Sequence, residues 1–127
     1  MQNAHIAAIT INQTVGDWIG NTKRIIRAAV AAHSRGARLI VFPEMCISGY
    51  SLGDRLLMDG TLSRSWSCLE QIAQRSSHSD LKDSVLVVGL PIRFADVLYN
   101  VAAVVCNGAI VGLVPKENLA TGDVQYE

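Results

Sequence analysis

The sequence contains few cysteines, and their placement excludes two common classes of small domain. Cys46, Cys68 and Cys106 are odd in number, far apart and in no CxxC arrangement. Neither a disulfide framework nor a structural zinc site is therefore expected. The three histidines have no spacing that would place a pair on one helix face, so we expect no metal site.

The sequence also lacks an excess of charge of either sign. Eleven basic and eleven acidic residues cancel at pH 7, so neither nucleic acid nor an anionic membrane is an expected partner. Every apolar run is shorter than the roughly 20 residues of a membrane-spanning helix. The N-terminal residues do not have the pattern of a signal peptide either. Together with the unpaired cysteines, these absences predict a soluble protein of the cytoplasm.

The first part of the chain alternates between strand and helix patterns. Residues 5–12 form a short apolar segment rich in β-branched side chains, typical of a buried strand. Apolar residues then recur at helical spacing from Asp17, an N-cap type of residue, to Gly36, which suits a C-cap. Residues 38–42 predict a second strand, which stops at Pro43 because proline cannot donate to a sheet ladder.

The remaining chain predicts a second helix and three more strands. Residues 64–75 are predicted to be helical, with an apolar side made of Trp66, Leu69, Ile72 and Ala73. Apolar runs predict strands at residues 84–90, 98–106 and 109–114, the first of them ended by Pro91. Asn107-Gly108 between the last two runs is a strong β-hairpin signal. This order predicts one α/β domain, a mixed sheet with helices packed on it.

Two of the apolar strands end in a proline that is followed by a charged residue. One gives Pro43-Glu44 and the other gives Pro115-Lys116. Strand ends are where α/β proteins hold catalytic and ligand-binding groups, because the sheet fixes the loop that follows. The simpler alternative is that each charge is the first residue after a buried strand to reach water. Position alone leaves both interpretations open.

The segments around these two residues resemble a known superfamily. The segment FPEMCISGY, from Phe42 to Tyr50, is similar to the glutamate motif of the nitrilase, or carbon–nitrogen hydrolase, superfamily. Pro115-Lys116 and the next three residues are similar to its lysine motif, and Tyr126-Glu127 is similar to a second glutamate that follows the lysine. The resemblance implies that residues 1–127 are the N-terminal portion of one hydrolase domain. It also implies an αββα sandwich and a homo-oligomer for the full-length protein.

The resemblance further implies an acyl transfer in which a cysteine thiolate attacks an amide carbonyl. Glu44 would be the proton-transferring base and Lys116 the oxyanion partner. The two would meet if adjacent strands end at the same edge of the sheet. Glu127 would order the lysine and the substrate, and Tyr50 would line the substrate pocket. The amidase step needs no cofactor.

A finer resemblance lies in the segment GYSLGDRL, from Gly49 to Leu56. It is similar to the amide-hydrolysing domain of glutamine-dependent NAD synthetases. Glutamine is then the expected small-molecule substrate, and its hydrolysis would give glutamate and ammonia for NAD synthesis. The chain has no GxxxxGK[ST] phosphate loop, so ATP would be used only by a separate synthetase domain.

None of the three cysteines fits the nucleophile of this superfamily, which lies well downstream of the lysine. Cys106 falls in an apolar strand and Cys68 on the apolar side of a helix, where burial is the simpler prediction. Cys46 is two residues from Glu44 and would share its face in an extended segment, but the superfamily gives that position no catalytic role. We therefore expect this chain alone to be inactive.

Two alternatives stay open. The substrate could be another amide, a carbamoyl compound or a nitrile, because most residues that would decide it are missing from the sequence. The chain could instead be a non-catalytic binding or assembly module that kept the scaffold and lost the reaction. In either case half a sandwich would expose an apolar sheet surface, so we expect the isolated chain to associate or aggregate.

Overall fold

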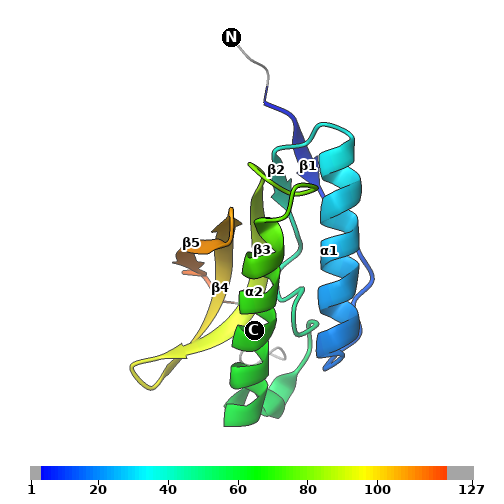
Figure 1. The fold of residues 1–127 in the computed structure, drawn as a ribbon. Coiled ribbons are helices and arrows are strands. Elements are labelled where there is room, and N and C mark those ends of the chain that lie inside the picture. The colour runs from blue at the N-terminus through cyan, green and yellow to red at the C-terminus, as the bar shows by residue number, and fades with distance from the viewer. Residues whose placement is uncertain (1–3, 120–127) are drawn as a thin grey trace.

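The structure is a computed structural model that describes residues 4–119. Its strands are β1 (Ile6–Ala8), β2 (Leu39–Val41), β3 (Val85–Phe94), β4 (Val97–Cys106) and β5 (Ala109–Pro115). Its helices are α1 (Trp18–Ser34), α2 (Asp59–Ser76) and a short 3-10 helix, η1 (Gly53–Leu57). Figure 1 shows α1 and α2 on the same side of the sheet. The α/β fold class with helices packed on a sheet is confirmed.

The five strands form one mixed sheet whose spatial order, β1-β2-β3-β4-β5, is also the order along the chain. Strands β1, β2 and β3 are parallel, whereas β4 is antiparallel to both β3 and β5. Strand β5 therefore runs in the same direction as β2. The C-terminal ends of β2 and β5 therefore lie at the same end of the sheet, and the residues that follow the two strands lie there too.

Helix α1 begins and ends as the sequence predicts. The Asp17 side chain caps the helix by accepting a hydrogen bond from the Gly20 backbone N–H at 3.0 Å. Gly36 follows the helix with a φ of +92°, a left-handed conformation that favours glycine. Apart from Asn21, the side chains that α1 buries recur three or four residues apart, namely Thr22, Ile25, Ala29 and Ala32. This spacing gives the helix one apolar side to pack on the sheet.

Helix α2 is longer than predicted, and one of the four residues predicted for its apolar side is not buried. It begins at Asp59 rather than at residue 64, and its N-cap, Met58, makes no side-chain capping bond. The start therefore lacks the side-chain cap that would mark it, although Asp59 places an acidic residue in the first turn. Leu69, Ile72 and Ala73 are buried as predicted, but Trp66 is partly exposed and its indole N–H donates to Glu70 at 2.9 Å.

The prediction that Pro91 ends β3 is wrong. Pro91 lies inside β3, opposite Asn100 of β4. The Asn100 carbonyl accepts a hydrogen bond from the Lys116 N–H at 2.8 Å, so the backbone polar groups of Asn100 point toward β5. Those of its partner Pro91 therefore point away from β4, toward the side of β3 where β2 pairs. Strand β2 pairs with β3 only as far as Val87, so the missing N–H of Pro91 costs no ladder bond.

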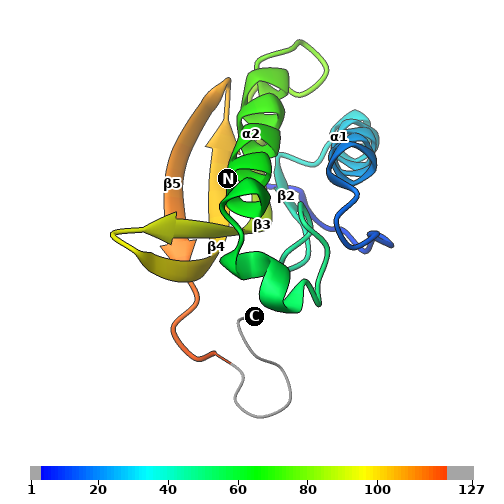
Figure 2. The same cartoon turned by 90° about the horizontal axis from the view of Figure 1, so that it is seen from below.

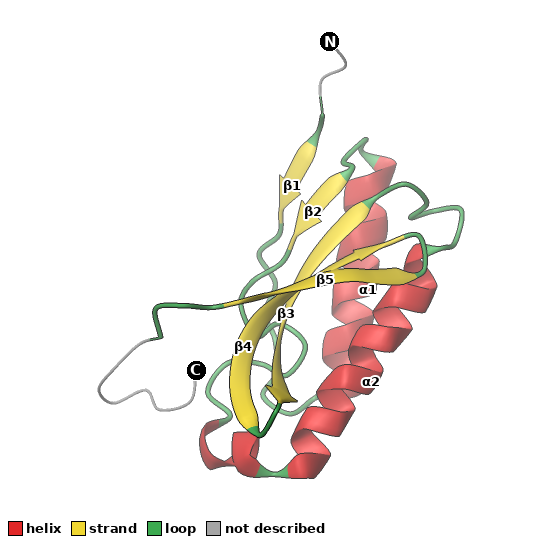
Figure 3. Ribbon diagram, turned by 90° about the vertical axis from the view of Figure 1, so that its left-hand side faces the viewer, coloured by secondary structure: helices red, strands yellow, loops and turns green. Residues whose placement is uncertain are grey.

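The two faces of the sheet are covered to very different extents. The centre of the face toward the helices is buried, with α1 over β2 and α2 over β3, β4 and β5 (Figure 2), whereas Ile110 and Leu113 of β5 stay partly exposed. Its central side chains belong to the main hydrophobic core, and they include Ile40, Leu86, Val88, Ala103 and Val105. We call the opposite face the open face, and Figure 3 looks onto it. Many of its side chains are apolar and only half-buried, and they include Val41, Val87, Ala102, Val104 and Cys106.

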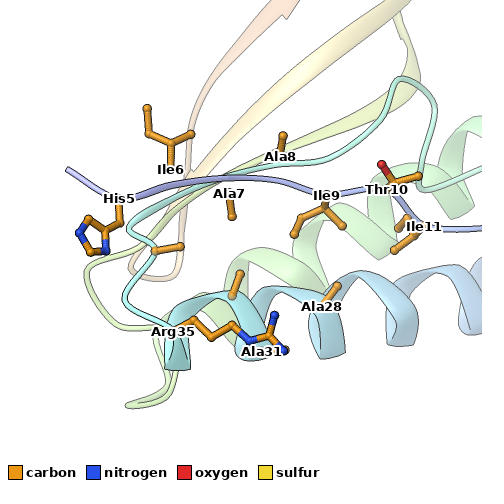
Figure 4. A pocket seen from close by; sticks show the side chains of 12 residues that line it. His5, Ile6, Ala7, Ala8, Ile9, Thr10, Ile11, Ala28, Ala31 and Arg35 are labelled. Atoms are coloured by element: carbon orange, nitrogen blue, oxygen red, sulfur yellow. The ribbon is translucent and has the colours of Figure 1, made fainter. Parts of the chain in front are cut away.

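Strand β1 shows the same division of side chains between the two faces. Ala7 and Ile9 point toward α1, whereas Ile6 and Ala8 point away from it onto the open face (Figure 4). Ile6 is 65% exposed. The regular strand covers only Ile6–Ala8 of the predicted residues 5–12, although Ile9 still donates to the Val41 carbonyl at 2.8 Å.

Candidate active site

Glu44 lies on a loop that leaves β2 and continues along the free edge of β3. The Ile47 N–H donates to the Gly89 carbonyl at 3.1 Å. The Glu44–Met45 backbone crosses directly over Gly89, where a Cβ atom would lie 2.4 Å from the Met45 nitrogen. Met45 itself is fully buried with a φ of +54°, a conformation that costs about 1–3 kcal/mol in a non-glycine residue. A glycine at position 89 is therefore needed to place Glu44.

The loop is also held from the side of α1. The fully buried side chain of Asn21 donates to the carbonyls of Thr14 at 2.9 Å and Ile47 at 3.0 Å. Gln13 donates to the Cys46 carbonyl. The backbone that follows Glu44 is thus fixed between α1 and β3. In the sequence, the only signal for this role of Asn21 is that a polar residue lies on the apolar side of a helix.

Lys116 follows β5 directly and reaches Glu44. Its Nζ lies 2.7 Å from Oε1 of Glu44, and the two side chains are 30% and 39% exposed. The two residues meet, but the strands before them are not adjacent as expected, because β3 and β4 lie between β2 and β5. Three strand spacings are about 14 Å, so the two strand ends alone could not bring these residues together. The crossing of the Glu44 loop over Gly89 shortens this distance.

A third residue, Asn100 of β4, completes this group. Its side-chain amide donates to Oε1 of Glu44, and the residue is 7% exposed. Glu44, Lys116 and Asn100 line one depression of about 380 Å³. The floor of the depression is the open face of the sheet, with Val41, Val87, Gly89, Ala102 and Val114. The sequence analysis missed Asn100, whose only signal is an amide inside an otherwise apolar strand.

The cysteines are not placed to act as nucleophiles at this pair. Cys46 is buried against β3, with Sγ 3.3 Å from the Gly89 nitrogen. Burial raises the pKa of the Cys46 thiol to about 12, so it stays protonated near neutral pH. Cys68 is buried in the core as predicted. Cys106 is half-buried on the open face rather than in the core.

The sequence also predicts Tyr50 and Glu127 as substrate-binding residues. Tyr50 is 41% exposed and is not among the residues that line it, so its role in substrate binding stays a prediction. Glu127 lies outside the described residues. Within residues 4–119, no group of three or more His, Cys, Asp or Glu side chains could hold a metal ion. No helix in that range is long and apolar enough to cross a membrane.

A larger groove of about 710 Å³ lies between β1 and α1 (Figure 4). Its lining is mainly small and apolar, with Ala28, Ala31 and Ala32 on the helix side. It contains His5 and Arg35 but no acidic residue. It therefore offers no acid–base pair of the kind that Glu44 and Lys116 form.

Comparison with known proteins identifies the family. The model of the carbon–nitrogen hydrolase family matches residues 5–125. The chain belongs to this family. Among its relatives, the glutamine-dependent NAD(+) synthetase of Mycobacterium tuberculosis is 42% identical over 122 residues, which are 96% of this chain and 18% of the relative. The corresponding protein of Saccharomyces cerevisiae is 34% identical over 115 residues, which are 91% of this chain and 16% of the relative.

Solved structures of family members agree with this fold. A glutamine-dependent NAD(+) synthetase from Cytophaga hutchinsonii superposes with a TM-score of 0.84 at 32% identity, over 92% of this chain and 19% of that protein. An amidase of the nitrilase superfamily from Nesterenkonia superposes with a TM-score of 0.78 at 21% identity, over 97% of this chain and 46% of that protein. The chain thus shares the nitrilase fold and spans less than a quarter of the NAD synthetases that it matches.

Proposed function

We propose that this chain is the N-terminal part of a glutaminase domain that hydrolyses the side-chain amide of glutamine and supplies ammonia for NAD synthesis. The relatives that share 42% and 34% identity with it are glutamine-dependent NAD(+) synthetases. The observation that carries the proposal is the Glu44–Lys116 pair, 2.7 Å apart on the open face of the sheet. An acid–base group and a fixed cation at one site are what amide hydrolysis through a thioester needs.

In the proposed reaction, the pair serves a cysteine thiol from outside this chain. Glu44 takes the thiol proton, and the thiolate attacks the amide carbonyl to form a tetrahedral intermediate whose oxyanion Lys116 stabilises. The C–N bond then breaks, and the amide nitrogen leaves as ammonia with the proton that Glu44 returns. Glu44 next takes a proton from water, and the resulting hydroxide attacks the thioester carbonyl. The C–S bond breaks, Glu44 returns the proton to the cysteine sulfur, and glutamate leaves.

The rest of the longer protein has to supply two things. One is the nucleophile, because Cys46 and Cys68 are buried and Cys106 lies at the hairpin end of β4, six residues along the strand from Asn100. The other is a cover over the depression, since electrostatic stabilisation is much stronger where water is excluded. The chain alone is therefore inactive in this proposal. ATP would be used by a separate synthetase domain, and the homo-oligomer and the cytoplasmic location stay predictions.

The test uses the full-length protein that carries this segment, with ammonia release from glutamine as the measurement. Glu44→Gln should lower kcat about 10²–10⁴-fold, the usual contribution of a general base. Lys116→Met should lower it about 10²–10³-fold, as expected for an oxyanion partner. Glu70→Gln, the same change at an exposed glutamate of α2, should leave kcat unchanged. If Glu44→Gln retains the wild-type kcat, Glu44 is not the base.

The substrate and the inactivity of the chain are tested separately. Glutamine, aliphatic amides, carbamoyl compounds and nitriles are compared by kcat/KM in the full-length protein, and glutamine should be preferred. A preference for one of the other classes would assign the site to that substrate instead. If the isolated 127-residue chain releases ammonia from glutamine at an enzyme-like rate that Glu44→Gln abolishes, the prediction of inactivity is wrong.

A further inference from the structure

Asn100 contacts both members of the Glu44–Lys116 pair. Its side chain faces Oε1 of Glu44, and because a carboxylate only accepts hydrogen bonds, the group it presents must be its NH₂. Its backbone carbonyl accepts from the Lys116 N–H at 2.8 Å. One residue of β4 therefore sets the direction of the Glu44 carboxylate and the position from which the Lys116 side chain departs.

The two side-chain donors converge on the same carboxylate oxygen. Lys116 Nζ and Asn100 Nδ2 both donate to Oε1 of Glu44. Within residues 4–119, the structure contains no hydrogen bond to Oε2 of Glu44. The two oxygens are thus distinguished by their surroundings, and Oε2 is the one turned away from both donors.

This distinction matters because the last torsion of a glutamate side chain is soft. The terminal sp³–sp² torsion has broad, roughly two-fold preferences, so an unrestrained carboxylate exchanges its oxygens readily. A lysine ammonium restrains it weakly, because its stem is flexible and its three donors rotate. The short, buried amide of Asn100 on a paired strand is a more directional restraint.

We propose that Asn100 is a positioning residue that fixes Oε1 of Glu44 and so reserves Oε2 for proton transfer. The inference rests on the proposed function, in which Glu44 is the base. It assigns Asn100 no contact with the substrate, so the residue acts through Glu44 and not directly on the reaction.

The fold itself has little need of this amide. Among the described residues, the Asn100 side chain makes one hydrogen bond, to Glu44, and the neighbouring strand positions Val101 and Ala102 are apolar. Glu44 is 39% exposed and can be hydrated if the amide is removed. A purely structural role would therefore appear in the melting temperature, whereas the positioning role appears in kcat.

The experiment is made in the full-length protein with glutamine as substrate. Asn100→Leu should lower kcat about 10–100-fold, the loss expected when a reacting group is misplaced by about 1 Å, with KM changed less than about threefold. Asn100→Ser, which keeps a donor, should recover part of the loss. Asn100→Asp has the shape of asparagine but adds a like charge beside Glu44, so the acid limb of the pH–rate profile should move to higher pH.

Asn107→Asp is the matched control. The Asn107 side-chain amide also donates to a carboxylate, that of Asp83 at 3.1 Å. Asn107 follows β4 directly and lies in the hairpin, at the other end of the strand from Asn100. The control should keep the wild-type kcat and pH profile. If Asn100→Leu fails to fold, the isosteric Asn100→Asp still carries the test.

The two proposals fail in different ways. If Glu44→Gln abolishes ammonia release while Asn100→Leu and Asn100→Asp keep the wild-type kcat and pH profile, the positioning role is wrong and the base assignment stands. If Glu44→Gln itself is fully active, the base assignment is wrong and the role of Asn100 falls with it.

Discussion

The two faces of the sheet are made of the same kinds of side chain but differ in what lies over them. Val88 and Val87 are neighbours on β3, yet Val88 is fully buried under the helices and Val87 is half-buried on the open face. The Glu44–Lys116 pair lies at the margin of the open face, whereas among residues 4–119 no charged side chain is buried on the helix side. The face that lacks a cover is therefore the face that carries the candidate chemistry.

This difference indicates that one covering layer would serve two purposes. An ion pair with partners 30% and 39% exposed contributes only about 0–1 kcal/mol to stability, so the Glu44–Lys116 pair is not needed to hold the fold. The same pair becomes effective in catalysis once water is excluded from it. A second sheet, as in the αββα sandwich that the resemblance implies, would bury the apolar open face and dehydrate the pair together.

The largest expected effect is on the association of the isolated chain. If the open face drives association, Val104→Lys near its centre should convert oligomers into monomers, because the lysine ammonium would have to be buried at the contact. Sedimentation velocity measures the change. Gln74→Lys adds the same charge on the exposed side of α2 and should leave the oligomers intact. Unchanged oligomers of Val104→Lys would place the contact elsewhere.

A smaller effect is expected on stability, from the same substitution on each face. Val88→Ala should lower the free energy of unfolding by about 1.5–3 kcal/mol, because it removes buried carbons and leaves a cavity. Val87→Ala should cost less than about 1 kcal/mol in the isolated chain, since Val87 still meets water. Urea unfolding of both variants measures the difference. Equal losses would show that the open face is already covered in solution.

The fold was predictable where the local sequence alone determines the structure. Asp17 is the N-cap of α1. Asn107 and Gly108 form the turn of the last hairpin, with φ values of +46° and +88° that asparagine and glycine tolerate. The predictions were wrong where the structure of a segment depends on other parts of the fold. Pro91 continues β3 because β2 ends earlier, and α2 begins at Asp59 without a capping side chain. Neither fact is visible in the local sequence.

The candidate site was predictable only in part for a similar reason. Glu44 and Lys116 stand after strand ends that the sequence shows, and their motifs resemble the family. Asn100 contacts Glu44 across 56 positions of the chain, and Gly89 is required by a crossing backbone. Both contacts depend on the placement of β3 and β4 between the ends of β2 and β5, and the hydrophobic periodicity of the sequence does not predict this placement.

The smallest effect should come from acid, and it should be confined to the helix-covered side. The Gly20 N–H and the Arg24 guanidinium hold the pKa of Asp17 below its usual value, and Arg75 does the same for the pKa of Asp80. A carboxyl with a lowered pKa stabilises the fold above its unfolded pKa, near 4, and loses that contribution as the pH falls through the folded value. Asp17→Asn keeps a good N-cap but cannot titrate, so its urea midpoint should fall less between pH 6 and pH 3 than that of the wild type. Asp54→Asn, at an exposed aspartate of η1, should follow the wild type. If the urea midpoint of Asp17→Asn falls as much as that of the wild type, the ion pair at the start of α1 does not contribute to acid sensitivity.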